Sequence, residues 1–453
     1  MTKLVLGWLR AASLLVLVAA GSASARAELA VVERWPIGDN ACVDAPLRLT
    51  FDRPPVLGSA GKIEVCRVAD GLPVETIELG AAEYVDRFGA TGGSMLRYEP
   101  VQIDGNAVSI RLRARSLHYG ESYFVRVAAD VFKDSDGHGF AGITDGWKFQ
   151  TKAALPRNPD RITVAADGSG DFCTVQGAVD QVEPYRDRET VIFVKKGRYR
   201  ELVRVGRERR HIHLVGEDRK GVVLACANNE KLNPGWLQRA VLGIEADDFV
   251  LENLTIQNTT PYKGSQAEAV YVNADRCVLR NADFLSLQDT LCLSGRSYIV
   301  DSYIEGDVDY VWGYGTAVFE RCELRSMHDG YLVQARNPPS RAGYTFFNCR
   351  LTAAPGVKKC WLARIETTRF PASHVAFLRC AMGSHILPEG WQVTGGESDA
   401  LRFEEFGSTD LLGQSLDLTQ RSRAARQLTP EQAAALSPAK LLGDSDGWNP
   451  AAK

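Results

Sequence analysis

A short strand-like pattern that recurs along the second half of the chain is the feature that most constrains the fold. Each copy has apolar residues, then a small or polar residue, then apolar residues again. The copies align on six positions, separated by 28, 21, 20, 27 and 31 residues: Asn253, Asn281, Ser302, Cys322, Cys349 and Cys380. Periods of this length that vary from copy to copy predict a solenoid whose coils carry loops of different length.

The composition of the repeated units favours strands over helices. The units are short and rich in β-branched and aromatic residues, they show no helical periodicity, and many glycines lie between them. We therefore expect each unit to belong to one coil of a parallel β-helix. Neighbouring coils of such a stack lie about 4.8 Å apart. Residues one coil apart in the sequence can then touch.

Two pairs of polar residues have this spacing. Asp289 and Asp309 are 20 residues apart, and Gln266 and Gln288 are 22 apart. Two carboxyl groups in contact do not ionise independently, because each charge raises the pKa of the other. Such a pair supplies one protonated carboxyl as an acid and one carboxylate as a base, and the glutamine amides can donate to an oxyanion. These groups suit hydrolysis without a metal. The alternative is a polar ladder with a structural role, and the spacing alone leaves both interpretations open.

A series of motifs between about residues 160 and 450 has the order found in a known family. The motifs lie at residues 170–180, 197–201 (G-x-Y-x-E), 266–272 (family Q-A-V-A-L), 288–291 (Q-D-T-L), 306–313 (family G-x-V-D-F-I-F-G), 362–364 (family L-G-R-P-W), 388–391 (P-E-G-W) and 446–450 (D-G-W-x-P). This stretch resembles the pectin methylesterases, carbohydrate esterases built on a right-handed parallel β-helix. The order and number of the motifs make the resemblance specific.

The resemblance implies a role for each polar residue of the two pairs. Asp309 would be the nucleophile that attacks a galacturonate methyl ester, and Asp289 the acid that protonates methanol and then the base that activates water. Arg364 would hold Asp309 ionised through a charge-assisted contact. Gln266 and Gln288 would stabilise the tetrahedral intermediate. Further residues expected to bind substrate are Tyr310, Arg336, Glu366 and Trp391.

Three departures from the family pattern limit these expectations. Glu366 stands where L-G-R-P-W has tryptophan, which removes an apolar contact with a sugar and adds a negative charge facing an acidic polymer. Substrate affinity or substrate identity is therefore open. Tyr310 replaces a phenylalanine and adds a hydroxyl that needs a partner. Ser302 replaces a cysteine that in many relatives can pair at the position of Cys322.

Five of the ten cysteines carry an expectation. Cys322, Cys349 and Cys380 fall at equivalent repeat positions, so we expect them to line the solenoid interior as small apolar residues. We expect Cys42 and Cys66, both near the N-terminus, to form a disulfide in an oxidising compartment. No C-x-x-C or H-x-x-x-H spacing occurs, so neither a metal nor another cofactor is expected.

The first 27 residues are typical of a cleavable secretory signal. Lys3 and Arg10 precede an apolar run at residues 11–20, and small residues follow it before a mature start near Arg26 or Glu28. The run is short for a membrane span. We expect a secreted or periplasmic protein that is not inserted in a membrane.

The remaining chain is long enough for two domains, both of β structure. Residues 28–152 contain short strand-like runs separated by turn formers, which predict an antiparallel β-sandwich. This segment resembles bacterial Ig-like modules around residues 49–51 and 149–151. Residues 153–160 form a proline-containing linker, and residues 161–450 the β-helix. Acidic residues at 130, 134 and 136 favour a polar turn over a calcium site.

The C-terminal segment carries a helix signal. Residues 428–436 form the predicted helix, with Thr429 as N-cap and Pro430 in the first turn. We expect this segment to pack over the solenoid.

The charge of the chain is nearly balanced, with 53 basic and 56 acidic residues. No basic stripe supports nucleic-acid binding. A polyanionic substrate would be favoured by basic groups in its groove, and four arginines are candidates, although they can equally be solvated: Arg321, Arg325, Arg336 and Arg341.

The leading hypothesis is a secreted, monomeric pectin methylesterase that converts homogalacturonan methyl esters to pectate and methanol. The alternatives are a related esterase or thioesterase acting on a different ester, which Glu366 motivates, and a non-catalytic glycan-binding β-helix protein. A serine hydrolase is disfavoured because no G-x-S-x-G motif occurs. A polysaccharide lyase on the same fold would be expected to carry an acidic calcium-binding cluster.

Overall fold

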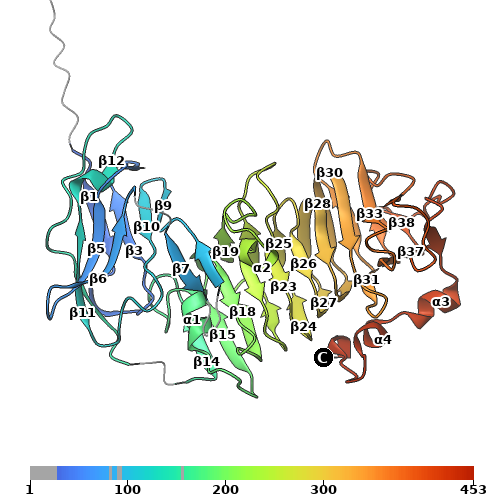
Figure 1. The fold of residues 1–453 in the computed structure, drawn as a ribbon, viewed down its shortest axis with the longest axis horizontal. Coiled ribbons are helices and arrows are strands. Elements are labelled where there is room, and N and C mark those ends of the chain that lie inside the picture. Colours follow the sequence, from blue (N-terminus) through green and yellow to red (C-terminus); the bar gives the residue numbers. More distant parts are fainter. Residues whose placement is uncertain (1–27, 81–83, 89–93, 155–157, 453) are drawn as a thin grey trace, which may run out of the picture.

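The computed structural model describes residues 28–452 except 81–83, 89–93 and 155–157. The expected signal at residues 1–27 and three residues of the expected linker lie outside this part of the chain. The described residues form a mainly antiparallel unit near the N-terminus and a long stack of parallel strands, which continues to a short helical tail (Figure 1).

The N-terminal unit consists mainly of two sheets. One has the strand order β1 (Val31–Trp35), β3 (Leu47–Phe51), β10 (Ala107–Ile110), β9 (Val101–Asp104). The other has the order β2 (Gly38–Ala41), β13 (Lys148–Thr151), β11 (Ser122–Val127), β5 (Lys62–Arg67), β6 (Pro73–Glu78). Two ladders accompany them, β4 (Val56–Leu57) with β12 (Phe132–Lys133) after the 3-10 turn η1 (Ala129–Val131), and β7 (Val85–Phe88) with β8 (Ser94–Arg97).

Alternation along the strands builds a core between these two sheets. In β3, Leu47, Leu49 and Phe51 are buried while the residues between them are partly exposed. The same apolar cluster includes Val65 of β5 and Tyr123 of β11, from the other sheet. The strand-like runs expected from the sequence therefore form a sandwich. Its relationship to Ig-like modules stays a prediction.

The acidic turn of this unit is closed by its own groups. Asp134 Oδ1 accepts hydrogen bonds from the backbone N–H groups of Asp136 and His138, at 3.0 and 2.8 Å. Asp134 Oδ2 accepts one from Arg53 Nε at 3.0 Å. These are the contacts of a polar turn.

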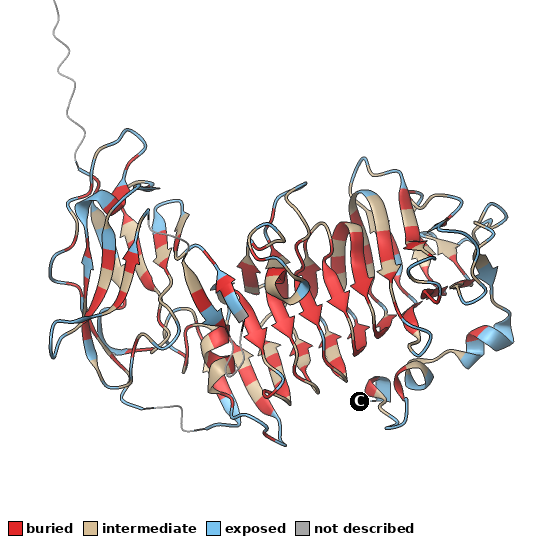
Figure 2. Ribbon diagram, viewed as in Figure 1, coloured by how far each residue is buried: buried red, intermediate tan, exposed pale blue. Residues whose placement is uncertain are grey.

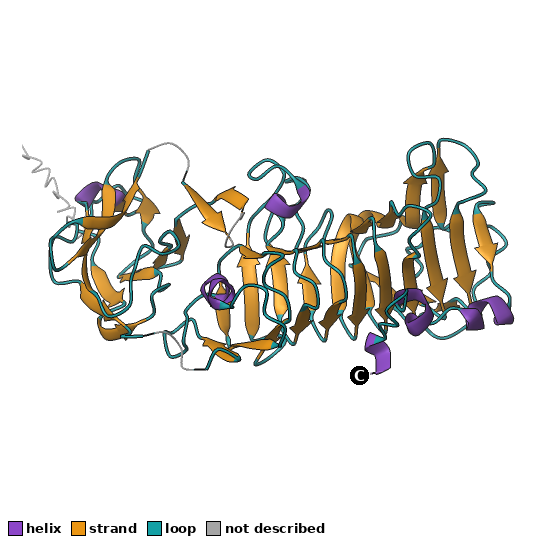
Figure 3. Ribbon diagram, turned by 60° about the horizontal axis from the view of Figure 1, so that its bottom comes forward, coloured by secondary structure: helices purple, strands orange, loops and turns teal. Residues whose placement is uncertain are grey.

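The parallel strands wind as a right-handed β-helix with a continuous buried interior (Figure 2). One face is an eleven-stranded parallel sheet, in order β14 (Arg161–Val164), β15 (Thr190–Val194), β18 (Ile212–Gly216), β21 (Val250–Glu252), β24 (Cys277–Arg280), β27 (Arg296–Val300), β29 (Thr316–Glu320), β31 (Gly343–Phe347), β34 (His374–Leu378), β37 (Arg402–Phe406) and β39 (Ala425–Gln427). Figure 3 shows these strands side by side along the stack.

Two further faces complete each coil and meet in two long strands, β28 (Tyr303–Gly313) and β30 (Glu323–Ala335). The second face also contains β16 (Gly197–Tyr199), β19 (Val222–Cys226), β22 (Thr255–Asn258), β25 (Asp283–Leu285), β32 (Arg350–Ala353), β35 (Ala381–Met382) and β38 (Thr409–Asp410). The third also contains β17 (Val203–Val205), β20 (Leu242–Ile244), β23 (Val270–Val272), β26 (Leu291–Leu293), β33 (Cys360–Glu366) and β36 (Trp391–Thr394).

The turns after six strands of the first face, β21, β24, β27, β29, β31 and β34, show that the repeat alignment is shifted by one residue. Six positions in these turns have positive φ, the left-handed conformation that asparagine and aspartate tolerate: Asn253, Asn281, Asp301, Arg321, Asn348 and Arg379. The strand pairing places these positions in register, since Val300 pairs with Arg280 and with Glu320. Ser302 and the three cysteines are therefore equivalent to Leu254 and Ala282, not to the asparagines.

The interior ladders explain why the repeat carries cysteines. Cys322, Cys349 and Cys380 are buried as expected, and each thiol lies against backbone carbonyls. Beside them Phe319, Phe346 and Phe377 stack on consecutive coils, with ring centroids 4.4 and 4.6 Å apart. Burial raises the pKa of Cys349 well above its ordinary value, so this thiol stays neutral in the core.

Helix α1 (Val175–Gln181) closes the first coil and joins the two units. Glu201 accepts hydrogen bonds from the backbone N–H groups of Val175 and Gln176 at its N-terminus. Asp44 of the N-terminal unit accepts from the N–H groups of Cys173 and Thr174. Carboxylates are favourable at a helix N-terminus because unpaired N–H groups point toward them. The N-terminal unit thus supplies part of the cap.

The expected pairing of Cys42 with Cys66 is wrong. Cys42 directly follows β2 and Cys66 lies in β5, and β13 and β11 separate these strands in the sheet. Three strand spacings amount to about 14 Å, too far for a disulfide. Cys42 Sγ instead lies within 4.8 Å of Cys173 Sγ, from the β-helix, and accepts a hydrogen bond from Lys152 Nζ. The sequence distance between Cys42 and Cys173 concealed this contact.

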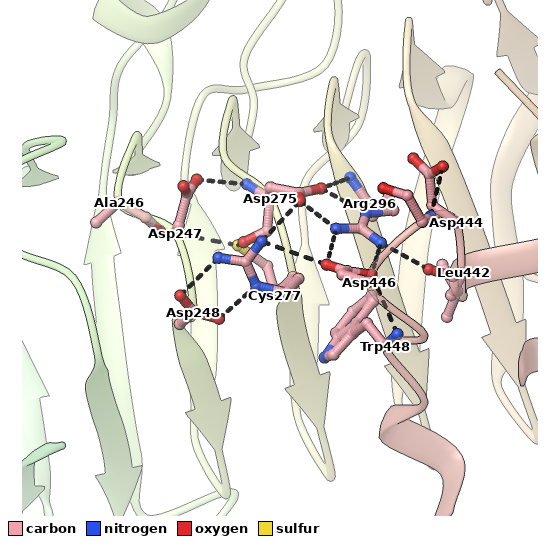
Figure 4. A network of polar contacts seen from close by, with 12 residues as sticks. Ala246, Asp247, Asp248, Asp275, Cys277, Arg296, Leu442, Asp444, Asp446 and Trp448 are labelled. Atoms are coloured by element: carbon pink, nitrogen blue, oxygen red, sulfur yellow. Dashed lines mark hydrogen bonds and ion pairs between the residues drawn. The ribbon is translucent and has the colours of Figure 1, made fainter. Parts of the chain in front are cut away.

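The C-terminal tail folds back along the solenoid. Helix α3 (Pro430–Ala435) begins at the expected N-cap Thr429, which forms a capping box with Gln432, and α4 (Pro438–Leu442) and a 3-10 turn (η2, Pro450–Ala452) follow. Arg296 of β27 donates to Asp446 of the tail and to Asp275 of the preceding coil (Figure 4). Leu442 packs against Tyr298 and Val318 of the first face.

No helix among the described residues combines the length and apolar character needed to cross a membrane.

We predict that oxidation links Cys42 to Cys173. Refolding the full chain with oxidised glutathione should form this bond, because docking of the two units brings the thiols together, and two molecules of reduced glutathione are released per bond. Peptide mapping after alkylation checks it. Cys66→Ser should leave the linked peptide in place and Cys42→Ser should remove it, whereas a peptide linking Cys42 to Cys66 would contradict the structure.

Candidate active site

The two aspartates lie where the chain passes from the second face of the solenoid to the third. Asp309 is in β28, which spans both faces, and Asp289 is two residues before β26. The register pairs Leu291 with Val311, so Asp289 and Asp309 stand level on neighbouring coils. A hydrogen bond from the Asp289 N–H to the Val308 carbonyl, 3.0 Å long, ties the two turns together. The structure therefore places the two aspartates together, as their spacing predicted.

Both aspartates have a left-handed backbone, with φ of 70° for Asp289 and 48° for Asp309. The register of β28 is irregular on either side of Val308. Backbone strain of this kind is tolerated where the surrounding structure over-determines it, and it re-aims a side chain from the direction a regular strand would give. Short polar side chains adopt this conformation with the least cost.

Arg364 holds the Asp309 carboxylate in a two-pronged contact. Arg364 Nε donates to Asp309 Oδ1 at 2.9 Å, and Arg364 Nη2 donates to Oδ2 at 2.5 Å. Arg364 lies in β33, and Ala363 pairs with Val333, which in turn pairs with Val311 of β28. The guanidinium also lies 4.3 Å over the ring of Tyr331. Two parallel charge-assisted bonds fix the plane of the carboxylate.

Asp289 has a different partner, which the sequence reasoning missed. Arg239, in α2 (Trp236–Arg239), donates through Nη2 to Asp289 Oδ2 at 2.9 Å. The same guanidinium donates to both oxygens of Glu268, and to Glu230. Glu268 is fully buried and Arg239 is 5% exposed. A buried arginine with this many carboxylate partners is oriented rigidly.

The surroundings of the two carboxyl groups differ in a way that separates their roles. Burial raises the pKa of Asp289 well above its usual range, and the Glu268 and Asp309 carboxyls add to the rise. Arg239 and Arg336 oppose it. Burial also raises the pKa of Glu268 to about 7, against the effect of Arg239. Asp289 is thus favoured as a protonated acid, while Asp309 is paired with a cation.

The two glutamines lie beside this pair. The Ala267 N–H donates to the Gln288 carbonyl at 3.1 Å, so the backbones of the two glutamine-bearing segments run together. Gln266 Oε1 accepts a hydrogen bond from Ser265 Oγ at 2.9 Å, so the donors of this side chain are its amide N–H groups. Both side chains are partly exposed, as donors to a bound substrate must be.

Two residues expected to bind substrate are buried in the solenoid core, and those expectations are corrected. Tyr310 is fully buried, and its hydroxyl lies 3.4 Å from Ser326 Oγ. Trp391 is 2% exposed; it donates through Nε1 to Glu405 and stacks on Phe403. Trp391 of the P-E-G-W motif and Tyr310, the residue after Asp309, therefore contribute to the packing of the core. A motif match identifies positions but does not tell which way their side chains point.

Arg336 and Glu366 lie at the edge of the site. The Arg336 guanidinium stands 4.7 Å over the ring of Trp312 and is close enough to Asp289 to oppose the rise in the pKa of Asp289. Glu366 Oε1 accepts a hydrogen bond from the Thr368 N–H at 3.1 Å, within its own turn. Arg321, another candidate groove arginine, pairs instead with Asp301 and Glu320 on the first face.

One sequence signal pointed to the missed residues. Glu268 replaces the valine of the Q-A-V-A-L segment, and an acidic residue between two buried alanines requires a cationic partner. The partner could not be named from sequence, because Arg239 lies in the short helix α2 of a preceding coil. The site as a whole can attack a carbonyl with one carboxylate, protonate a leaving group with another, and donate amide hydrogen bonds to an oxyanion.

Comparisons with known proteins concern the β-helix part of the chain. The sequence model of the pectinesterase family matches residues 161–445. Pectinesterase 31 of Arabidopsis thaliana is 35% identical over 204 residues, which are 42% of this chain and 64% of that protein. Pectinesterase 2 of Olea europaea is 29% identical over 285 residues, 60% of this chain and 75% of that protein. The chain thus spans a little under two thirds of the first of these relatives.

Solved structures give the same result for the fold. A pectin methylesterase in complex with a hexasaccharide is 27% identical, with a TM-score of 0.54, over 64% of this chain and 98% of that one. The pectin methylesterase of Erwinia chrysanthemi is also 27% identical, with a TM-score of 0.54, over 66% and 99%. The carrot enzyme, at 23% identity and a TM-score of 0.58 over 64% and 95%, supports the fold alone. With a family model that covers well over half its length, this chain belongs to the pectinesterase family.

Proposed function

We propose that the protein hydrolyses the methyl esters of galacturonate residues in pectin, with Asp309 as nucleophile and Asp289 as acid and base. The observation that carries the proposal is the unequal pair of stacked aspartates, one held by Arg364 and one buried with a raised pKa. Family membership supports the reaction class, and a related structure that contains a hexasaccharide supports a polysaccharide substrate. The leader expected in the sequence would place the enzyme outside the cytoplasm.

The first half of the reaction forms a covalent intermediate. Asp309 attacks the ester carbonyl carbon, and the carbonyl oxygen takes up negative charge next to the amide groups of Gln266 and Gln288. The bond to the methoxy oxygen then breaks, and Asp289 gives its proton to that oxygen, so methanol leaves. The galacturonyl group remains bound to Asp309 as an anhydride.

The second half regenerates the enzyme. Asp289, now ionised and held by Arg239, takes a proton from water, and the resulting hydroxide attacks the galacturonyl carbon. The bond to Asp309 breaks, the galacturonate leaves as a free acid, and Arg364 again holds Asp309 as a carboxylate. Asp289 ends the cycle protonated. Its two roles are those of a group whose neighbours stabilise both protonation states.

A second candidate is hydrolysis of a different ester by the same residues. The observation that favours it is Glu366 at the position where the family motif has tryptophan. The catalytic groups would be unchanged, and the difference would lie in the part of the substrate beyond the ester. Methanol release from methylated pectin distinguishes the two candidates.

We predict that Asp309→Asn abolishes methanol release from highly methylated pectin. The amide is nearly isosteric and tolerates the positive φ, so the fold should be kept while the nucleophile is lost. Methanol production by the purified chain measures the effect. Asp301→Asn is the matched control, because Asp301 also has positive φ, at 50°, but pairs with Arg321 on the first face. Release by Asp309→Asn at the wild-type rate would exclude Asp309 as nucleophile.

We predict opposite shifts of the pH profile for changes at Arg239 and Glu268. The alkaline limb of kcat/KM follows loss of the acid proton of Asp289 in the free enzyme. Arg239→Met removes a cation that lowers the pKa of Asp289, so the limb should move to higher pH. Glu268→Gln removes a charge that raises this pKa, so the limb should move to lower pH. Shifts in the same direction would show that Asp289 does not titrate in that limb.

A further inference from the structure

The helix that carries Arg239 is too short to fix its own orientation. α2 has four residues, and the Arg239 N–H donates to the Gly235 carbonyl at 3.0 Å. A single helical turn fixes several backbone angles for few hydrogen bonds, so it is not stable by itself. The position of the guanidinium that donates to Asp289 therefore depends on what holds this turn from outside.

Two buried side chains hold the end of α2. The carbonyls of Gln238 and Ala240, on either side of Arg239, each accept two hydrogen bonds. Asn228 Nδ2 donates to both carbonyls, at 2.8 and 2.9 Å, and Arg204 Nη2 also donates to both, at 2.8 Å each. Carbonyls at a helix C-terminus have no partners within the helix, so they need donors from elsewhere. These donors fix the backbone of Arg239.

Asn228 is held in turn by a second asparagine. Asn233 Nδ2 donates to Asn228 Oδ1 at 2.8 Å. Asn228 is 0% exposed and Asn233 is 4% exposed. The oxygen and the amide nitrogen of Asn228 are thus both engaged, and a buried amide with these partners has one favoured orientation.

Asn233 is bound to the N-terminal unit. Its Nδ2 donates to the Arg97 carbonyl at 2.9 Å, and its Oδ1 accepts from the Arg97 N–H at 2.9 Å. Arg97 is in β8, which pairs with β7 along its other edge. A side-chain amide carries the same donor and acceptor as a peptide group, so Asn233 occupies the place of a neighbouring strand. A continuous series of hydrogen bonds therefore joins β8 to the backbone of Arg239.

Apolar packing fixes the β7–β8 ladder on the β-helix. Phe88, Leu96 and Tyr98 form a buried cluster with Leu202, which directly precedes β17. The Arg111 guanidinium lies 4.3 Å over the Phe88 ring. The ladder thus has a defined position relative to the coil that it contacts, and Asn233 is bound to a fixed partner.

We propose that the N-terminal unit positions the catalytic acid of the β-helix. The β7–β8 ladder holds Asn233 and Asn228, which we call the asparagine relay. The relay fixes the backbone of Arg239, and Arg239 in turn fixes the Asp289 carboxyl. This inference rests on the proposed function, since it takes Asp289 to be the acid and base. The relay residues act through Arg239 and are positioning residues. Arg204 gives α2 a second anchor, so loss of the relay should loosen the contact to Asp289 without abolishing it.

The charges around Asp289 determine the sign of the effect. The charged groups facing Asp289 lie on several elements: Arg239 in α2, Glu268 before β23, Asp309 in β28, Arg336 after β30 and Arg364 in β33. Arg239 is the one whose flanking carbonyls Asn228 holds. Arg239 lowers the pKa of Asp289, so a looser contact raises this pKa and keeps the acid protonated to higher pH.

The pH profile of methanol release by the full chain tests the relay. Asn233→Ala should move the alkaline limb of kcat/KM to higher pH by about half a unit, less than Arg239→Met. Added to Arg239→Met, it should give no further shift, because the relay acts through Arg239. Asn253→Ala is the control: it removes a 2.8 Å bond to the Gly216 carbonyl on the first face, and should lower stability without moving the limb. No shift in Asn233→Ala, an equal shift in Asn253→Ala, or full additivity with Arg239→Met would overturn the inference.

Hydrogen exchange of the unliganded full chain tests the relay without turnover. Asn233→Ala should speed exchange of the backbone amides at residues 235–241, and Asn253→Ala should not. Phe88→Ala should have the same effect from the N-terminal unit, and Leu202→Ala removes the β-helix side of the same apolar contact. Unchanged exchange in folded Phe88→Ala and Leu202→Ala proteins would overturn the role of the N-terminal unit. If exchange responds but wild-type protein releases no methanol, the proposed function fails and the relay stands as a link between the units.

Discussion

The register between neighbouring coils is the constraint on which the rest of the structure depends. Backbone hydrogen bonds pair Leu291 with Val311, Val311 with Val333 and Val333 with Ala363, so residues far apart in sequence stand level on the third face. Asp289, Asp309 and Arg364 lie beside this row. A slip of one residue in any coil would turn a catalytic side chain into the core and a core side chain outward. The stacked phenylalanines and buried cysteines oppose such slips from inside.

The catalytic chemistry depends on the different surroundings of two chemically identical side chains, Asp289 and Asp309. Asp309 is given one cation in a two-pronged contact, whereas Asp289 is buried between a cation and two carboxyl groups. The Arg239–Glu268 pair is nearly neutral as a unit, so it can orient Asp289 without removing its proton.

The N-terminal unit contacts the start of the β-helix directly. Asp44 completes the N-terminal cap of α1, and Lys152 and Cys42 contact the first turn of the β-helix at Gly170 and Cys173. A solenoid must cover the open end of its first coil, because its interior would otherwise meet water. Glu201 and Asp44 share that task, one from each unit. The C-terminal tail lies along the first face, where Arg296 of β27 donates a hydrogen bond to Asp446.

The sequence by itself determined the repeat, the strand class, the two stacked aspartates and the tail helix, because all of these follow from local patterns and from spacings of about one coil. The structure alone decided which side chains point outward: Tyr310 and Trp391 lie within family motifs and were expected to bind substrate, yet both are in the core. It also decided contacts across long sequence distances, namely Cys42 with Cys173 and Arg239 with Asp289. The physical reason is that loop lengths between coils vary, so the sequence shows the period but not which loop residues meet.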